Sequence, residues 1–163
     1  DGHANWAYDA APTTPVFEAP TLTSTSTDGK TILEQQIQNV IAEGFGANIV
    51  SGADVLENPS AYYINNYFSE GDYSGFGHIK GAYRINPMIV EDNTILGLDP
   101  DGKVVTYCYT GQTSAVITAY LNVLGYDAYS LGAGMNSLYN SNASWTTNQW
   151  TGDSNPKSLP YVQ

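Results

Sequence analysis

The chain has 163 residues, the length of one ordinary domain, and 42% of them are hydrophobic, enough for one core and too many for a disordered chain. It carries 16 acidic and 5 basic residues, a net charge of −11, and the scattered cations form no patch for nucleic acid or an anionic membrane. No apolar run reaches the ~18 residues of a membrane-spanning helix, so no such segment is predicted.

The single cysteine, Cys108, excludes an internal disulfide and a cysteine-based zinc or iron–sulfur site within one chain. We expect neither a metal site nor a cofactor. Few lysines, 13 tyrosines and many small polar residues are typical of exported proteins, so we expect an extracytoplasmic location, whether periplasmic, secreted or surface-tethered. The N-terminus has no basic segment followed by an apolar one, so any export signal is expected to have been removed.

The two ends of the chain differ from its middle. Residues 1–30 include a stretch rich in Pro and Thr without helical or strand periodicity, which predicts a solvated tether. The alternative is an ordered arm that packs on the domain through Trp6, Tyr8 and Phe17. Residues 142–163 are polar and predict a C-terminal extension, in which Trp145 and Trp150 are candidate anchors. Residues 31–141 are expected to form the domain itself.

Within that domain, helical and strand patterns alternate. In chain order the predicted elements are a helix from Thr31 to a stop at Gly44, a strand at 48–50, a helix at 52–57, a strand at 61–68, a Gly-rich loop at 69–80, a strand at 83–85, a turn at 98–102, a strand at 103–107, a helix at 113–124, a strand at 127–131 and a helix at 134–139. This alternation predicts an α/β domain with an open, mostly parallel sheet.

The most informative segment surrounds Cys108. A buried strand is predicted to end at this cysteine, and a helix begins five residues later. In an open α/β sheet this corner lies at the carboxyl edge, where ligands bind, and its backbone amides and helix dipole favour a thiolate. Gly111 allows a tight turn with positive φ, and Thr113 or Ser114 is expected to cap the helix. Cys108 is therefore a candidate nucleophile, although a small buried thiol that only packs is the simpler alternative.

The segment from Cys108 to Ser114 resembles the active-site loop of the rhodanese family, sulfurtransferases with a Cys-x-x-Gly-x-(Arg/Thr)-Ser pattern. Further matches follow in the family's order: Asp72-Tyr73 with the GHIKGA stretch at 77–82, Gly125-Tyr126 with the strand after it, and the Gly-Ala-Gly stretch at 132–134 before the last helix. Together they span residues 49–139. The resemblance implies a rhodanese-like α/β domain, with an open, mostly parallel sheet and helices on both faces.

The resemblance also implies a reaction. Cys108 would take the outer sulfur of a small sulfur-containing donor, hold it as a persulfide and pass it to a thiol or another thiophilic acceptor. The substrate would then contact the loop, formed by Tyr109, Thr110, Gly111, Gln112, Thr113 and Ser114. His78 and Arg84 are accessory candidates: His78 is expected mainly to shape its own loop, and Arg84 mainly to make surface or ion-pair contacts.

Several departures from the family bear on the substrate. The family often has Asp-x-Arg where this chain has Asn, Tyr and Phe at 66–68, so Asp72 needs a partner other than arginine. Lys80 replaces a usual proline, and the loop 108–114 contains no cation. Ser114 stands where phosphoester-cleaving proteins of a related fold class place an arginine, which argues against phosphatase activity.

Three hypotheses about function follow. The first is an enzyme, a persulfide-forming sulfurtransferase that uses Cys108. The second is an exported, non-catalytic module that holds sulfide, polysulfide or another chalcogen species for a partner. The third is an inactive domain that retains only the fold, and an intact thiol in a Gly-containing loop counts against it.

Overall fold

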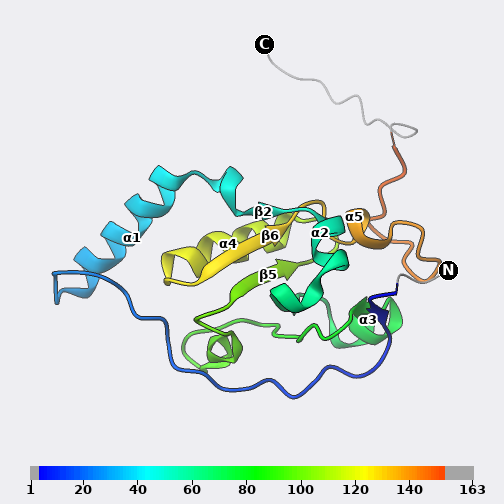
Figure 1. Ribbon diagram of the computed structural model, residues 1–163, viewed down its shortest axis with the longest axis horizontal. Helices are drawn as coiled ribbons and strands as arrows, with labels where there is room; N and C mark the ends of the chain where they lie inside the picture. Colours follow the sequence, from blue (N-terminus) through cyan, green and yellow to red (C-terminus); the bar gives the residue numbers. More distant parts are fainter. Residues whose placement is uncertain (1–3, 153–163) are drawn as a thin grey trace, which may run out of the picture.

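The computed structural model describes residues 4–152 of the chain (Figure 1). Its elements are β1 (Trp6–Ala7), α1 (Gly29–Glu43), β2 (Ile49–Val50), α2 (Gly52–Glu57), β3 (Tyr63–Asn66), α3 (Glu70–Gly75), β4 (His78–Ile79), β5 (Lys103–Tyr107), α4 (Gln112–Val123), β6 (Asp127–Leu131) and α5 (Met135–Tyr139), with 3-10 turns at Phe45–Asn48, Pro59–Ala61 and Thr94–Gly97. No helix among these residues is both long and apolar enough to cross a bilayer.

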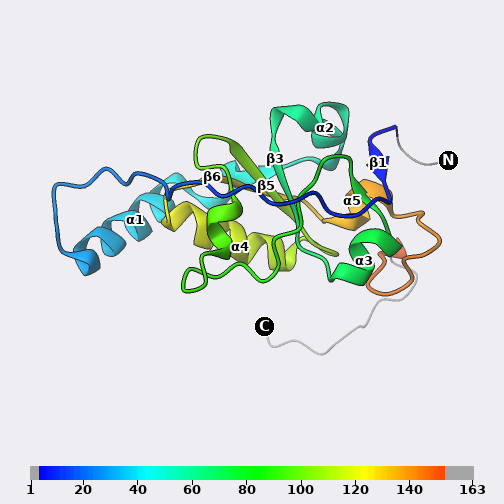
Figure 2. The same cartoon turned by 90° about the horizontal axis from the view of Figure 1, so that it is seen from below.

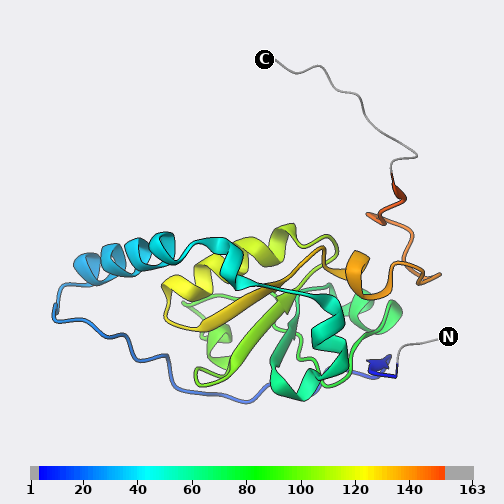
Figure 3. The same ribbon diagram turned by 45° about the horizontal axis from the view of Figure 1, so that its top comes forward.

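Four strands form a parallel sheet in the order β2-β6-β5-β3 (Figure 3). The central strand β5 pairs on both sides, with Val104 opposite Tyr63 of β3 and opposite Ala128 of β6. A central parallel strand is covered on both faces, and this explains why residues 104–107 of β5 are all buried instead of alternating between buried and exposed. The predicted open, parallel α/β sheet is thereby confirmed.

Helices cover both faces of this sheet, as predicted. Successive residues of a strand point to opposite faces, and Val104 and Val105 accordingly enter two different core clusters. Val105 packs in a cluster that includes Val55 of α2 and Leu138 of α5, whereas Val104 packs in one that includes Leu121 of α4. Figure 2 shows α2 and α4 on opposite sides of the strands. The sheet is therefore the middle layer of three.

Two predicted strands differ from the structure. The strand expected at 61–68 is confined to β3, because a 3-10 turn that begins with Pro59 extends to Ala61. The prediction of a strand at 83–85 is wrong, because this segment makes only one isolated bridge, from Tyr83 to Asn65. The side-chain oxygen of Asn65 accepts the N–H of Ile85 at 2.9 Å, so this amide does not continue the ladder.

The Gly-rich segment 69–80, expected to be a loop, contains the helix α3 and the short strand β4. Ser69 caps α3 by accepting the N–H of Asp72 at 3.2 Å, and both Glu70 and Asp72 lie in the first turn, where acidic side chains favour a helix N-terminus. These signals outweigh the helix-weakening glycines.

The N-terminal segment runs along the domain toward α1 (Figure 2, blue). Its strand β1 pairs with β4, and the buried indole of Trp6 donates from Nε1 to the carbonyl of Phe76 at 3.1 Å. Further along, the N–H of Phe17 donates to the carbonyl of Leu96 at 2.8 Å, whereas Tyr8 is exposed. The division of the chain at residues 30 and 141 stays a prediction, and residues 1–3 and 153–163 lie outside the described part.

The helix α1 extends away from the sheet (Figure 1). It contacts α4, but none of its residues, all within the described part of the chain, is buried. Its apolar residues Leu33, Ile37 and Ile41 are exposed. The rest of the domain therefore covers this helix only partly.

Candidate functional site

Cys108 follows directly after β5 and is only 2% exposed. Its sulfur accepts the backbone N–H of Ser114 at 3.4 Å. Ser114 is the third residue of α4, whose N-cap is Gly111 with φ 86°, and among the described residues no side chain caps this helix. The sulfur of Cys108 therefore takes the amide that an N-cap side chain usually accepts.

This geometry corrects one prediction. The sequence predicts that Thr113 or Ser114 caps α4, but both residues lie within its first turn and the N-cap is Gly111. The hydroxyl of Ser114 instead donates back to the carbonyl of Gly111 at 3.0 Å and lies 2.9 Å from the hydroxyl of Ser130 on β6. The Cys108 thiol can donate to the Ser114 hydroxyl at 3.7 Å. The positive φ predicted at Gly111 is present.

A second turn, at 132–134, holds the loop from the other side. The N–H of Met135, the first residue of α5, donates to the carbonyl of Cys108 at 3.0 Å. Gly134 has φ 56°, and a Cβ on it would lie 2.3 Å from that same carbonyl oxygen. A Cβ on Gly111 would lie 3.0 Å from the backbone nitrogen of Ala133. The two turns thus approach so closely that both require glycine.

Tyr109 turns toward α3 and gives Asp72 the partner that the sequence left open. Its hydroxyl donates to the carboxylate of Asp72 at 2.5 Å, and its ring stacks on Phe68 with centroids 4.5 Å apart. Asp72 also accepts the hydroxyl of Ser69 at 2.8 Å. Burial raises the pKa of Tyr109, and the hydrogen bond to Asp72 adds to this. The side chain of Tyr109 therefore anchors one end of the loop.

His78 lies in the core, 1% exposed, with its ring stacked on Tyr73. Nδ1 lies 3.2 Å from the carbonyl of Tyr73, and Nε2 lies 3.2 Å from the carboxylate of Asp9 in the N-terminal segment. Burial lowers the pKa of His78, and the contacts with Tyr73 and Asp9 oppose that shift. These contacts join α3, β4 and the N-terminal segment, and the loop around Cys108 has no part in them.

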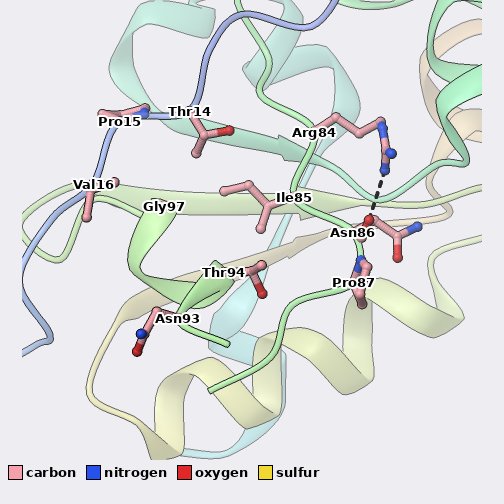
Figure 4. Close-up of a pocket in the computed structure, with 10 residues that line it drawn as sticks. All are labelled: Thr14, Pro15, Val16, Arg84, Ile85, Asn86, Pro87, Asn93, Thr94 and Gly97. Carbon is pink, nitrogen blue, oxygen red and sulfur yellow. Dashed lines mark hydrogen bonds between the residues drawn. The ribbon is translucent and has the colours of Figure 1, made fainter. Parts of the chain in front are cut away.

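Arg84 lines a cavity of about 260 Å³ beneath the N-terminal segment, beside Thr14 and Asn86 (Figure 4). Its guanidinium donates to the carbonyl of Asn86 at 3.0 Å and to that of Phe68 at 3.5 Å. None of the described residues that line this cavity belongs to the loop 108–114. The structure thus joins the predicted loop residues around Cys108 and places His78 and Arg84 in other settings.

A groove that no sequence pattern predicted lies beside the loop. It has a volume of about 620 Å³ and lies between Thr110 and Gln112 of the loop, α5 and the C-terminal segment. Its outer wall is formed by Asn148, Gln149 and Trp150. These residues belong to a polar, aperiodic stretch in which only the tryptophan suggested a contact. No three His, Cys, Asp or Glu side chains gather into a metal site within residues 4–152.

Comparison with known proteins agrees with the fold. Residues 66–141 match the model of the family described as Rhodanese-like domain. A rhodanese-related protein from Thermoplasma volcanium, known from a crystal structure, is 25% identical to this chain, with a TM-score of 0.50, and the alignment covers 56% of this chain and 89% of that one. No curated protein matches the chain.

Two more solved structures resemble this chain with lower sequence identities and TM-scores. A protein of unknown function from Rhodopseudomonas palustris, described as a possible tyrosine phosphatase, is 19% identical over 72% of this chain and 94% of its own, with a TM-score of 0.46. A protein from Lactobacillus plantarum is 18% identical over 64% of this chain and 90% of its own, with a TM-score of 0.43. Neither likeness carries an argument about activity. Residues 66–141 thus match a rhodanese-like domain, and the parallel sheet is the fold expected of such a domain.

Proposed function

We propose that the domain is a sulfurtransferase that carries sulfane sulfur on Cys108 as a persulfide. The observation that supports this most directly is the hydrogen bond from the N–H of Ser114 to the sulfur of Cys108 at 3.4 Å. The amides at the start of a helix carry partial positive charge, and here one of them is aimed at the sulfur. The same amide supports negative charge on the Cys108 sulfur, which is the nucleophile of the first step and the leaving group of the second.

The proposed reaction has two steps. The Cys108 thiolate attacks the outer sulfur of a donor; a bond forms between the two sulfurs, the donor's own bond to that sulfur breaks, and its electron pair leaves with sulfite or an organic thiolate. An acceptor thiolate then attacks the outer sulfur of the Cys108 persulfide. The Cys108 thiolate is regenerated as the leaving group, so no external oxidant or reductant is consumed.

The loop favours sulfur transfer over phosphoester cleavage. Its interior, 109–113, carries no charged side chain, and Ser114 stands where a phosphate-binding arginine would be needed. Sulfane sulfur needs no bidentate cation, because little charge builds up on the transferred atom. A phosphoryl group without such a cation is poorly held.

Intact mass spectrometry tests this proposal. The protein is incubated separately with thiosulfate, with inorganic polysulfide and with an organic persulfide, and we expect a gain of one sulfur that a reductant removes. Cys108→Ser is the control, because serine is close in size but a far weaker nucleophile, and it should gain none. Failure to load from every donor, or loading of the Ser variant, would overturn the proposal.

A second candidate is a carrier rather than a turnover enzyme. It is favoured by the burial of Cys108, 2% exposed, beneath a loop held by the Met135 amide and by Gly134. A persulfide formed there would be shielded until a partner opened the loop. Following the loaded protein after a small thiol is added separates the two: rapid loss of sulfur identifies an enzyme, and retention identifies a carrier.

We also propose that the protein acts outside the cytoplasm, where it would be periplasmic, secreted or tethered to the surface. The support is compositional: 5 Lys and Arg against 16 Asp and Glu, with 13 Tyr. Fractionation of source cells, with detection of the protein by antibody, tests the location. Recovery in the cytoplasmic fraction alone would contradict it.

A further inference from the structure

The groove beside the loop is built from three parts of the chain: the loop, the start of α5 with the turn before it, and the C-terminal segment. Thr110 and Gln112 come from the loop, and the hydroxyl of Thr110 donates to Oε1 of Gln112 at 3.0 Å, which orients that amide. The facing wall belongs to residues 148–150, which lie outside the segment 66–141 that matches the family. One wall of the groove is therefore formed by the C-terminal segment of this chain.

Two asparagine side chains hold that segment in place: Asn136 of α5 and Asn140, which directly follows α5. Oδ1 of Asn136 accepts the backbone N–H of Trp150 at 2.6 Å, and its Nδ2 donates to the carbonyl of Asn148 at 3.4 Å. Nδ2 of Asn140 donates to the carbonyl of Trp150 at 3.0 Å. Both polar backbone groups of Trp150 are thereby bonded to the domain, and its indole is left to line the groove.

The lining has a distinctive chemistry. None of the described residues that line the groove is charged, and its amides and hydroxyls come from Thr110, Gln112, Asn136, Ser137, Asn148 and Gln149. Trp150 is 62% exposed, whereas the other two tryptophans, Trp6 and Trp145, are buried in the core. A large exposed aromatic side chain in a groove, among hydrogen-bonding groups, is typical of a site for a small organic molecule.

Resting on the proposed sulfur transfer, we propose that this groove binds the organic part of the sulfur donor, an uncharged persulfide that carries amide or hydroxyl groups. Its body lies against the indole of Trp150, and its persulfide end passes Thr110 to reach Cys108. The Cys108 thiolate takes the outer sulfur, the donor's S–S bond breaks, and an organic thiolate leaves with the bonding electrons. An anionic donor finds no cation in this lining and is repelled by the net charge of −11.

Trp150→Ala tests the groove, because it removes the indole but keeps both backbone hydrogen bonds of residue 150. With N-acetylcysteine amide persulfide as donor, we expect the KM for sulfur loading to rise about tenfold while kcat changes less than about twofold. The kcat/KM for thiosulfate should stay within about twofold. Tyr8→Ala, at an aromatic residue 54% exposed on the N-terminal segment, is the matched control and should change neither value.

A binding measurement separates this inference from the proposed function. The unreactive thioether S-methyl-N-acetylcysteine amide is titrated by calorimetry into Cys108→Ser and into the same variant with Trp150→Ala. We expect roughly tenfold weaker binding without the indole, and Trp150→Phe should restore most of it. Equal binding by the two variants, or equal KM changes for both donors, would overturn the inference. Failure of Cys108 to load from any donor, with binding intact, would overturn only the transfer step.

Discussion

At the scale of single residues, the hydrogen bond from the hydroxyl of Tyr109 to the carboxylate of Asp72 ties the loop after Cys108 to the helix α3. Because position 68 is Phe rather than Arg, the sequence shows that Asp72 lacks the partner usual in the family. It does not identify the replacement, because Tyr109 lies in the loop after β5 and meets Asp72, and Phe68 on which its ring stacks, only in the folded domain. The need of Asp72 for another partner was therefore predictable from the sequence. That Tyr109 is this partner depends on tertiary packing.

His78 should make the stability of the fold depend on pH. Burial lowers its pKa below the ordinary value of 6.5, so the folded state binds fewer protons than the unfolded state near that pH. Stability is therefore fully present above about pH 6.5 and is lost as the pH falls through the folded-state pKa. We expect the free energy of unfolding to decrease between about pH 7 and pH 5, measured by urea denaturation.

The comparison that isolates this effect is His78→Gln, which removes the titrating ring but keeps hydrogen-bonding groups. Its overall stability is expected to be lower, so the slope against pH is the informative quantity. Carboxylates titrate in both proteins and cancel in the difference. The same slope in both proteins would show that His78 contributes nothing to the pH dependence.

At the scale of elements, the predicted bounds of helices and strands were correct where turn and capping residues agreed with the burial of the segment. The strands 103–107 and 127–131 and the helix 52–57 have their predicted bounds, because glycine-containing turns precede both strands and Ser51 caps the helix. The strand expected at 83–85 failed since the side chain of Asn65 accepts the backbone amide that would have extended the ladder. Such a contact joins residues 20 apart and leaves no periodic signal in the sequence.

Gly134 provides a test of how tightly the two turns of the site depend on each other. Alanine at this position meets the carbonyl oxygen of Cys108 and must adopt a positive φ, so we expect Gly134→Ala to lose ~1–3 kcal/mol of stability and to load sulfur more slowly. Thermal unfolding and mass spectrometry provide the two measurements. Gly71→Ala is the control, since nothing lies within 4 Å of its added Cβ in α3, and it should be neutral or slightly stabilising. Wild-type stability and loading in Gly134→Ala would show that the turns are not coupled.

At the scale of the whole molecule, charge is the dominant property. The net charge of −11 repels dianions over the ~10 Å that electrostatic forces reach at 0.1 M salt. Within the loop only backbone amides and the helix dipole oppose this repulsion, and they amount to about half a unit charge. Long-range repulsion should therefore dominate the approach of an anionic donor.

This balance predicts an unusual salt dependence. The second-order rate of sulfur loading from thiosulfate should be low and should rise between low and moderate ionic strength, because salt screens the repulsion. An uncharged organic persulfide should show a weaker dependence. Stopped-flow loading across a salt series measures both. A thiosulfate rate that falls with salt would mean that Lys80 and Arg84 create a local attractive field that outweighs the net charge.

The pairing of β1 with β4 has a consequence for the order in which the molecule folds. Trp6 bonds to a carbonyl 70 residues later in the chain, and its ring packs edge-on against Tyr139 at 5.7 Å. During synthesis neither partner exists when Trp6 leaves the ribosome, so this end of the chain must wait unpaired until nearly the whole domain has been made. The segment around Trp6 is thus among the last parts of the domain to be fixed, and the change in Trp6 fluorescence marks the end of folding.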